Sequence, residues 1–248
     1  MRPGASKTLI AAVACVAGAS CAVAADILRP SLPAVPVAAD WTGLYAGGHV
    51  GYAWDSRDAT IFSPAGAALA SGSTSANGIM GGGQIGYNFQ VTPSWVLGLE
   101  ADASGASLNS TAVGASGFGA RENKINAFGT VRGRLGYAWD RFLVYGTAGY
   151  AWANQEMIRT QQIGTINGAP PGTVESASGV ASGWTAGGGV EWAITPNWSF
   201  RAEYLHLDFA SQSFSFPLAG QRIDATAKID VARVGLNYFF DFSRYTPY

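Results

Sequence analysis

The chain has 248 residues, of which only 12% are charged, about half the share found in ordinary soluble domains, and 12% are aromatic. Its net charge of −1 provides no electrostatic footprint for nucleic acid. Both cysteines, Cys15 and Cys21, lie near the N-terminus, so disulfides and cysteine-based metal sites are excluded from the rest of the chain.

Residues 1–25 are typical of a cleaved signal peptide. Arg2 and Lys7 precede an apolar run of small residues, Leu9–Ala22, and the alanines that follow fit the small-x-small cleavage rule. A transmembrane helix fits less well, because the run is mostly alanine. A lipid anchor on Cys21 would want a Leu-like residue where the sequence has glycine. We therefore expect an exported protein.

Residues 26–40 form the next segment, with Pro30, Pro33 and Pro36 at three-residue spacing. This spacing favours an extended, semi-rigid linker that would lie in the periplasm. It is too short to be a domain, and we expect one domain over residues 41–248.

The remaining chain alternates apolar and polar residues and has no sustained helical period, which predicts strands. Eight segments show the alternation: Leu44–Trp54, Ile79–Val91, Trp95–Ser104, Lys124–Trp139, Phe142–Trp152, Trp184–Ile194, Trp198–Tyr204 and Ala232–Phe240. Three connections are tight, at 92–94, 140–141 and 195–197, and four are long, at about 55–77, 105–123, 153–183 and 210–225. The pattern predicts an all-β, eight-stranded antiparallel transmembrane barrel with short periplasmic turns and four long extracellular loops.

The alternation alone leaves open whether the apolar face points inward, as in a soluble barrel, or outward to lipid. Large rings gather on the apolar face near the tight turns and would overfill a small barrel, so we expect an outer aromatic girdle: Trp95, Trp139, Phe142, Trp192, Trp198 and Phe240. The lumen then receives four acids and four bases, which must pair: Glu100, Asp102, Arg132, Arg134, Glu191, Arg201, Glu203 and Arg233.

We expect these lumen charges to form two clusters. Arg132 and Arg134 would meet Glu100 and Asp102 as cross-strand pairs, and the other four charges would close the second cluster. Arg57 falls in the first predicted loop and would be free of the lumen.

Asp40–Trp54 resembles the opening strand, and Arg233–Phe240 the closing strand, of the opacity-type, porin-family outer-membrane surface proteins of alphaproteobacteria. The OmpA transmembrane domain is a similar eight-stranded barrel. The resemblance implies a surface-exposed outer-membrane protein in contact with outer-membrane lipid and lipopolysaccharide, folded by the barrel-assembly machinery. Such proteins usually end on an aromatic residue that the machinery reads. Here Asp241–Tyr248 follows Phe240.

The two histidines give little evidence of chemistry. His49 faces the predicted lumen, and His206 shares a strand face with Asp208 near the external rim. We expect no catalytic residue, cofactor or metal site. The favoured function is non-enzymatic: envelope integrity and display of surface loops. The alternatives are a narrow solute or ion pore and, third, a lipid-modifying enzyme at the rim.

Overall fold

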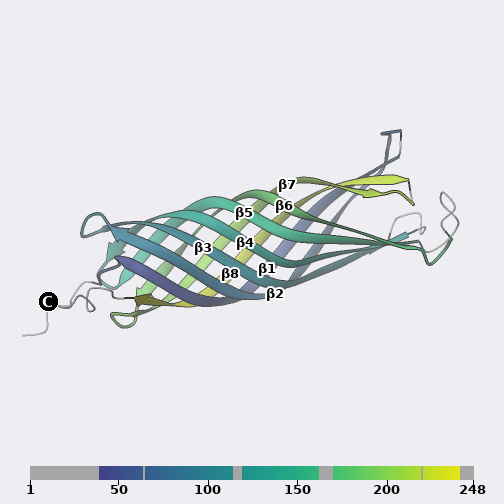
Figure 1. Ribbon diagram of the computed structural model, residues 1–248. Coiled ribbons are helices and arrows are strands. Elements are labelled where there is room, and N and C mark those ends of the chain that lie inside the picture. The colour runs from purple at the N-terminus through teal and green to yellow at the C-terminus, as the bar shows by residue number, and fades with distance from the viewer. Residues whose placement is uncertain (1–38, 64, 114–118, 162–169, 219, 241–248) are drawn as a thin grey trace, which may run out of the picture. The chain divides into compact units, whose positions relative to one another are not determined.

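The computed structural model describes residues 39–63, 65–113, 119–161, 170–218 and 220–240. Within them, eight strands form a closed barrel in which each strand pairs antiparallel with the next and β8 closes on β1 (Figure 1). The strands are β1 Gly43–Phe62, β2 Ala68–Gln90, β3 Trp95–Val113, β4 Gly119–Trp139, β5 Phe142–Gln161, β6 Val174–Ala193, β7 Trp198–Phe216 and β8 Gln221–Phe240. The predicted signal peptide, most of the linker and Asp241–Tyr248 lie outside the described residues.

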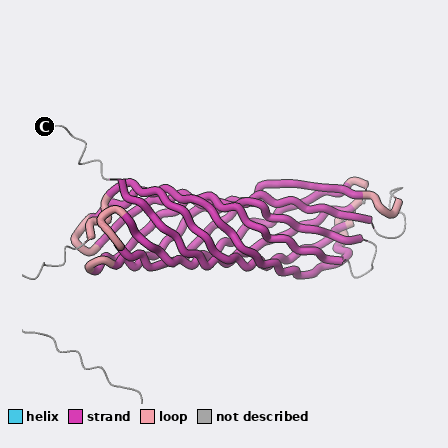
Figure 2. Tube along the Cα trace, turned by 90° about the horizontal axis from the view of Figure 1, so that it is seen from below, coloured by secondary structure: helices cyan, strands magenta, loops and turns pink. Residues whose placement is uncertain are grey.

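The tight turns lie together at one end of the barrel, which we call the turn end, and the other half of the strands is the distal half (Figure 2). Two of these turns are near copies. The Thr92 hydroxyl accepts a hydrogen bond from the Trp95 amide at 3.0 Å, and the Thr195 hydroxyl accepts one from the Trp198 amide at 3.0 Å. Such local side-chain bonds satisfy amides that the strand ladder leaves free at a turn.

The strands extend further than the sequence predicted. Most of each stretch expected to be a long loop continues the strands: β1 runs to Phe62, and β2 begins at Ala68. Arg57 lies within β1 and is buried, so its placement in a loop was wrong.

A change in the position of the apolar residues explains the error. In β7, Trp198, Phe200 and Tyr204 are exposed on the outer face. Beyond them, Leu205 and Leu207 are buried on the inner face. Because successive side chains point to opposite faces of a strand, a search for one continuous apolar face ends where this change occurs.

The distal half is split along two seams. β2 and β3 pair only from Met80–Ala106 to the turn end, and β6 and β7 only from Gly183–Phe209. β3 leaves β2 next to a register shift between Gly105 and Leu108. β7 leaves β6 next to a shift between Phe209 and Gln212. Such bulges twist a strand away from its neighbour and end pairing.

The distal half therefore consists of two four-stranded sheets, β7–β8–β1–β2 and β3–β4–β5–β6. Figure 1 shows the strands separating into these two groups at the distal end. Nowhere in the described ranges is there a helix long and apolar enough to span a membrane.

Candidate functional site: the charged layer of the lumen

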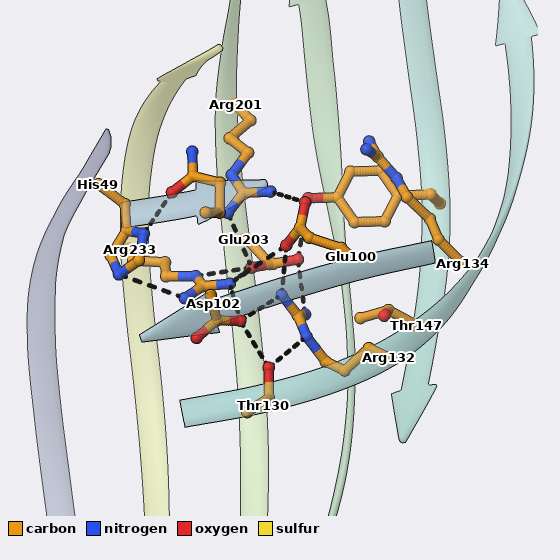
Figure 3. A network of polar contacts seen from close by, with 12 residues as sticks. His49, Glu100, Asp102, Thr130, Arg132, Arg134, Thr147, Arg201, Glu203 and Arg233 are labelled. Carbon is orange, nitrogen blue, oxygen red and sulfur yellow. Dashed lines mark hydrogen bonds and ion pairs between the residues drawn. The ribbon is translucent and has the colours of Figure 1, made fainter. Parts of the chain in front are cut away.

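Six charged side chains meet in the lumen of the turn-end half, and we call them the charged layer (Figure 3). They come from four strands: Glu100 and Asp102 on β3, Arg132 on β4, Arg201 and Glu203 on β7, and Arg233 on β8. All are buried, between 0% and 6% exposed. The period of two along each strand directs these positions inward, while their neighbours face outward.

Arg132 is the most connected member of the charged layer. Its Nη2 lies 2.5 Å from Glu100 Oε1 and 2.9 Å from Asp102 Oδ2, and its Nη1 lies 3.0 Å from Glu203 Oε1. Its Nε donates to the Thr130 hydroxyl at 2.8 Å, and that hydroxyl donates to Asp102 Oδ2 at 2.5 Å. The guanidinium thus joins two carboxylates on the neighbouring strand to one on the opposite wall.

The other two arginines complete the layer from the opposite wall. Arg201 Nη1 donates to Glu100 Oε2 at 2.5 Å. Arg233 Nη2 lies 2.6 Å from Glu203 Oε2 and 3.3 Å from Asp102 Oδ2. Three acids and three bases therefore neutralise one another in a space closed to solvent, the condition under which buried charges persist.

Arg134 and Glu191 form a separate ion pair nearer the turn end. Glu191 Oε1 also accepts hydrogen bonds from the Ser199 hydroxyl at 2.5 Å and from Asn237 Nδ2 at 2.8 Å. The Arg134 guanidinium lies over the Tyr145 ring, 3.6 Å from its centroid.

The structure brings all eight predicted lumen charges inside the barrel but groups them differently from the expectation. Arg134 pairs with Glu191 instead of Glu100 or Asp102, and Arg132 reaches across the lumen to Glu203. The expected contacts of Arg132 with Glu100 and Asp102, and of Arg233 with Glu203, are present. The separation into two clusters, and the places of Arg134 and Glu191 in them, were wrong. The barrel is narrow enough for a long arginine side chain to reach the opposite wall as easily as the next strand.

His49 extends the network toward β2. The ring is 4% exposed, and its nitrogens lie 2.5 Å from Gln84 Oε1 and 2.8 Å from Ser104 Oγ. Gln84 Nε2 in turn donates to Asn237 Oδ1 at 2.7 Å. His49 therefore fills the lumen, as expected from its position on the inner face.

Apolar layers lie on both sides of the charged layer, and the sequence analysis missed them. At the turn end the lumen holds an apolar cap: Trp41, Tyr45, Val96, Ala138, Leu143, Tyr145 and Phe239. In the distal half it holds a larger distal core: Ala53, Met80, Ile125, Phe128, Ala151, Ala153, Ala181, Leu205, Leu207, Phe209, Ala227, Ile229 and Val231. Within β7 and β8 the apolar residues move from the outer to the inner face of the strand toward the distal end. This change in the sequence pattern could have indicated the distal core.

The outer face carries two belts of aromatic side chains. The six predicted girdle residues lie near the turn end and are all exposed, from 39% for Phe240 to 77% for Trp139. A second belt, not predicted, lies where the outer face becomes polar: Tyr52, Trp54, Tyr150, Trp184 and Tyr204. The hydroxyls of Tyr52 and Tyr204 donate to Asn77 Oδ1 and Asp230 Oδ1. Two belts of this kind mark the two interfaces of a bilayer.

His206 lies on the outer face beside the second belt. Its Nδ1 is 2.7 Å from Asp230 Oδ1, and its ring lies 5.6 Å from that of Trp184. Asp208 lies on the same face of β7, as predicted, and its Oδ2 is 3.7 Å from Lys228 Nζ. Among the described residues, no group of three His, Cys, Asp or Glu side chains has a geometry that could hold a metal ion.

The family model for the outer membrane protein beta-barrel domain matches residues 11–240. The chain belongs to this family. The protein is accordingly an outer-membrane β-barrel, and its distal half is extracellular. The chain is 36% identical to the 31 kDa outer-membrane immunogenic protein of Brucella melitensis over 245 residues, covering 94% of this chain and 100% of that protein.

Two further proteins are similar to the chain. The 25 kDa outer-membrane immunogenic protein of Brucella canis is 30% identical, covering 88% of this chain and 91% of the relative. The outer membrane protein OprG from Pseudomonas aeruginosa, a solved structure, is 12% identical with a TM-score of 0.47 and covers 82% of this chain and 98% of that one.

Proposed function

We propose that this protein is a non-conducting barrel that reinforces the outer membrane and displays its extracellular half at the cell surface. The observation that carries the proposal is the charged layer, in which six buried side chains from opposite walls join across the lumen. The apolar cap and the distal core fill the lumen on either side. A rigid, filled barrel suits a structural role better than a conduit.

A narrow pore is the second candidate, and the charges themselves favour it, because polar lumens are typical of porins. To conduct, however, this barrel would have to separate pairs such as Arg132–Glu100 and Arg233–Glu203. Leaving one member of a buried pair alone costs about 3–5 kcal/mol. An open state that requires several such separations would be rarely populated.

A lipid-modifying enzyme at the rim has less support. Nucleophilic catalysis needs a nucleophile within hydrogen-bond reach of an oriented base. His206 is oriented by Asp230, but that carboxylate also accepts a hydrogen bond from the hydroxyl of Tyr204, a residue of the second aromatic belt. The arrangement suits anchoring at a membrane interface, where aromatic and polar groups gather.

Surface display has a separate line of support. The strands of the extracellular half continue well beyond the second aromatic belt and carry polar residues on their outer face. Relatives named as immunogenic outer-membrane proteins fit a chain whose extracellular half is reached by antibodies.

Conductance in planar bilayers tests the proposal. We expect the wild-type protein to insert and pass little current, and Arg132→Ala combined with Glu203→Ala to pass little more, because the apolar cap and the distal core still fill the lumen on both sides of the charged layer. A large, steady wild-type conductance would make the pore the better candidate. Deleting the gene should also sensitise cells to detergents, with full complementation by wild type; unchanged sensitivity would count against a role in envelope integrity.

A further inference from the structure

The free edge of β2 in the extracellular half is a candidate interaction surface. Residues 68–79 pair with β1 on one side, and among the described residues they have no ladder partner on the other. Residues 68–73 are exposed on both faces of the strand. A Cβ added at Gly72 would meet nothing within 4 Å.

The β6–β7 seam shows how a free edge is protected in the same molecule. Gln212 Nε2 donates to the Val180 carbonyl at 3.0 Å, so a β7 side chain occupies a backbone group of the β6 edge. Glu175 accepts the Leu218 amide at 2.9 Å across the same seam. Phe214 and Phe216 are buried beneath it. The seam is thus closed by side chains.

Residues 68–79 themselves include none of the residues that normally protect an edge. Residues 68–79 contain no charged residue and no proline, and Leu69 is 56% exposed on this segment. Natural proteins usually protect edges with charges, proline or a covering element, because unpaired amides and carbonyls act as a template for another strand. An edge at the cell surface that carries none of these residues is therefore suited to strand pairing.

We propose that residues 68–79 bind an extended, uncharged peptide segment of another protein, which adds to β2 as an antiparallel strand. The regular row of backbone donors and acceptors calls for a strand as its partner, since only a strand repeats both groups at the same spacing. The short serine, threonine and alanine side chains beside it admit small or β-branched neighbours and offer no charge for an ion pair.

A foreign strand fits this edge better than the β2 edge of a second copy. Two copies related by an axis along the membrane normal would bring their β2 edges together in parallel. Parallel pairing is slightly less stable per residue, and a separate peptide is free to run antiparallel. The proposal depends on the seam alone and does not require a closed lumen.

Hydrogen exchange on the full-length protein in detergent or lipid nanodiscs tests the proposal, with a strand-length peptide of alternating threonine and valine as the probe. Saturating peptide should slow exchange at residues 68–79 on the order of tenfold, the effect of about one net hydrogen bond. Exchange at residues 174–182 should not change. A peptide N-methylated at every residue cannot donate hydrogen bonds and should give no protection.

Proline variants locate the contact. Alternate amides of β2 point to β1 and to the free edge, so one of Thr74→Pro and Ser75→Pro removes only a free-edge donor. That variant should keep the β1–β2 exchange pattern and lose most of the peptide effect. The matched control Ser178→Pro, on the protected β6 edge, should leave the peptide effect unchanged.

Three outcomes would overturn the proposal. The first is an absence of protection by the unmethylated peptide, and the second is equal protection by the methylated one. The third is protection of residues 68–79 that grows with protein concentration alone, which would assign the edge to a second copy. Because the lumen plays no part in these measurements, failure here leaves the proposed structural function to be judged by conductance.

Discussion

The membrane half and the extracellular half of this barrel are built from the same eight strands but have opposite polarity. In the membrane half, apolar side chains such as Leu99 and Val144 face lipid, and charges such as Arg132 fill the lumen. In the extracellular half, Leu207 and Ile229 fill the interior, and the outer face is polar. The surrounding solvent decides which of the two alternating sets of side chains is apolar.

The comparison also shows why the two halves close differently. In the membrane half each strand is hydrogen-bonded to both of its neighbours, because an unpaired backbone group in hydrocarbon costs several kcal/mol. The extracellular half lies in water, which satisfies free edges, so bulges in β3 and β7 can open two seams there. The distal core holds the two resulting sheets together.

Breaking the charged layer should produce the largest loss of stability. Arg132→Ala leaves three buried carboxylates, those of Glu100, Asp102 and Glu203, with only two arginines to neutralise them, at a cost of about 3–5 kcal/mol. Urea unfolding in lipid vesicles measures the loss. The control Arg222→Ala removes an arginine that is 53% exposed and should cost under about 1 kcal/mol. Equal losses of unfolding free energy in the two variants would contradict a stabilising role for the lumen charges.

Replacing the pair as Arg132→Met with Glu100→Leu should recover part of that loss, because two acids and two bases then remain in balance and apolar side chains fill the space. The recovery should be incomplete, because Arg201 keeps only its 3.9 Å contact with Glu203. Recovery would show that unbalanced charge, and not lost packing, sets most of the loss in Arg132→Ala. A double variant as unstable as Arg132→Ala would mean that packing, and not charge, determines the loss.

The distal core should respond with a loss confined to the extracellular half. Leu207 is fully buried there, and Leu207→Ala should cost about 2–5 kcal/mol by leaving a cavity. Hydrogen exchange should accelerate in the distal parts of β7 and β8, with little change near the turn end. The matched control is Leu97→Ala on the lipid face, where Leu97 is 49% exposed. If Leu207→Ala loosened both halves equally, the two would not be separable units.

Glycines inside the membrane half give a smaller effect that depends on the face. A Cβ at Gly149 would lie 2.1 Å from the Val131 carbonyl oxygen and 2.6 Å from Arg132 Cα. At Gly133, on the outer face, the nearest such atom is 3.9 Å away. Gly149→Ala should therefore cost about 1–3 kcal/mol, and Gly133→Ala close to nothing. The same urea titration compares them, and a reversed order would contradict the inward placement of Gly149.

The sequence was sufficient for much of the fold and for part of the site. Strict alternation and the two similar Thr-Pro turns predicted eight strands, the aromatic girdle near the turn end and the set of inward charges. The grouping of those charges could not be predicted, because arginine reach across a narrow lumen depends on barrel diameter and stagger. The extracellular strands were missed because residues such as Ser73 and Gly179 have no apolar period, and their pairing depends on register alone.

The smallest effect should come from the ion pair on the outer wall of the extracellular half. Lys228 Nζ lies 3.7 Å from Asp208 Oδ2, with the two side chains 56% and 29% exposed. Water screens such a pair and both side chains lose entropy in making it, so a Lys228→Ala and Asp208→Ala cycle should give a coupling of about 0–1 kcal/mol. An Arg233→Ala and Glu203→Ala cycle on the buried 2.6 Å pair should give a coupling several times larger. Raising the salt concentration should weaken the outer coupling and leave the lumen coupling nearly constant, since ions screen exposed charges far more than buried ones. Equal couplings, or equal sensitivity to salt, would mean that the lumen is open to water, and the distinction between a filled membrane half and a solvated outer wall would fail.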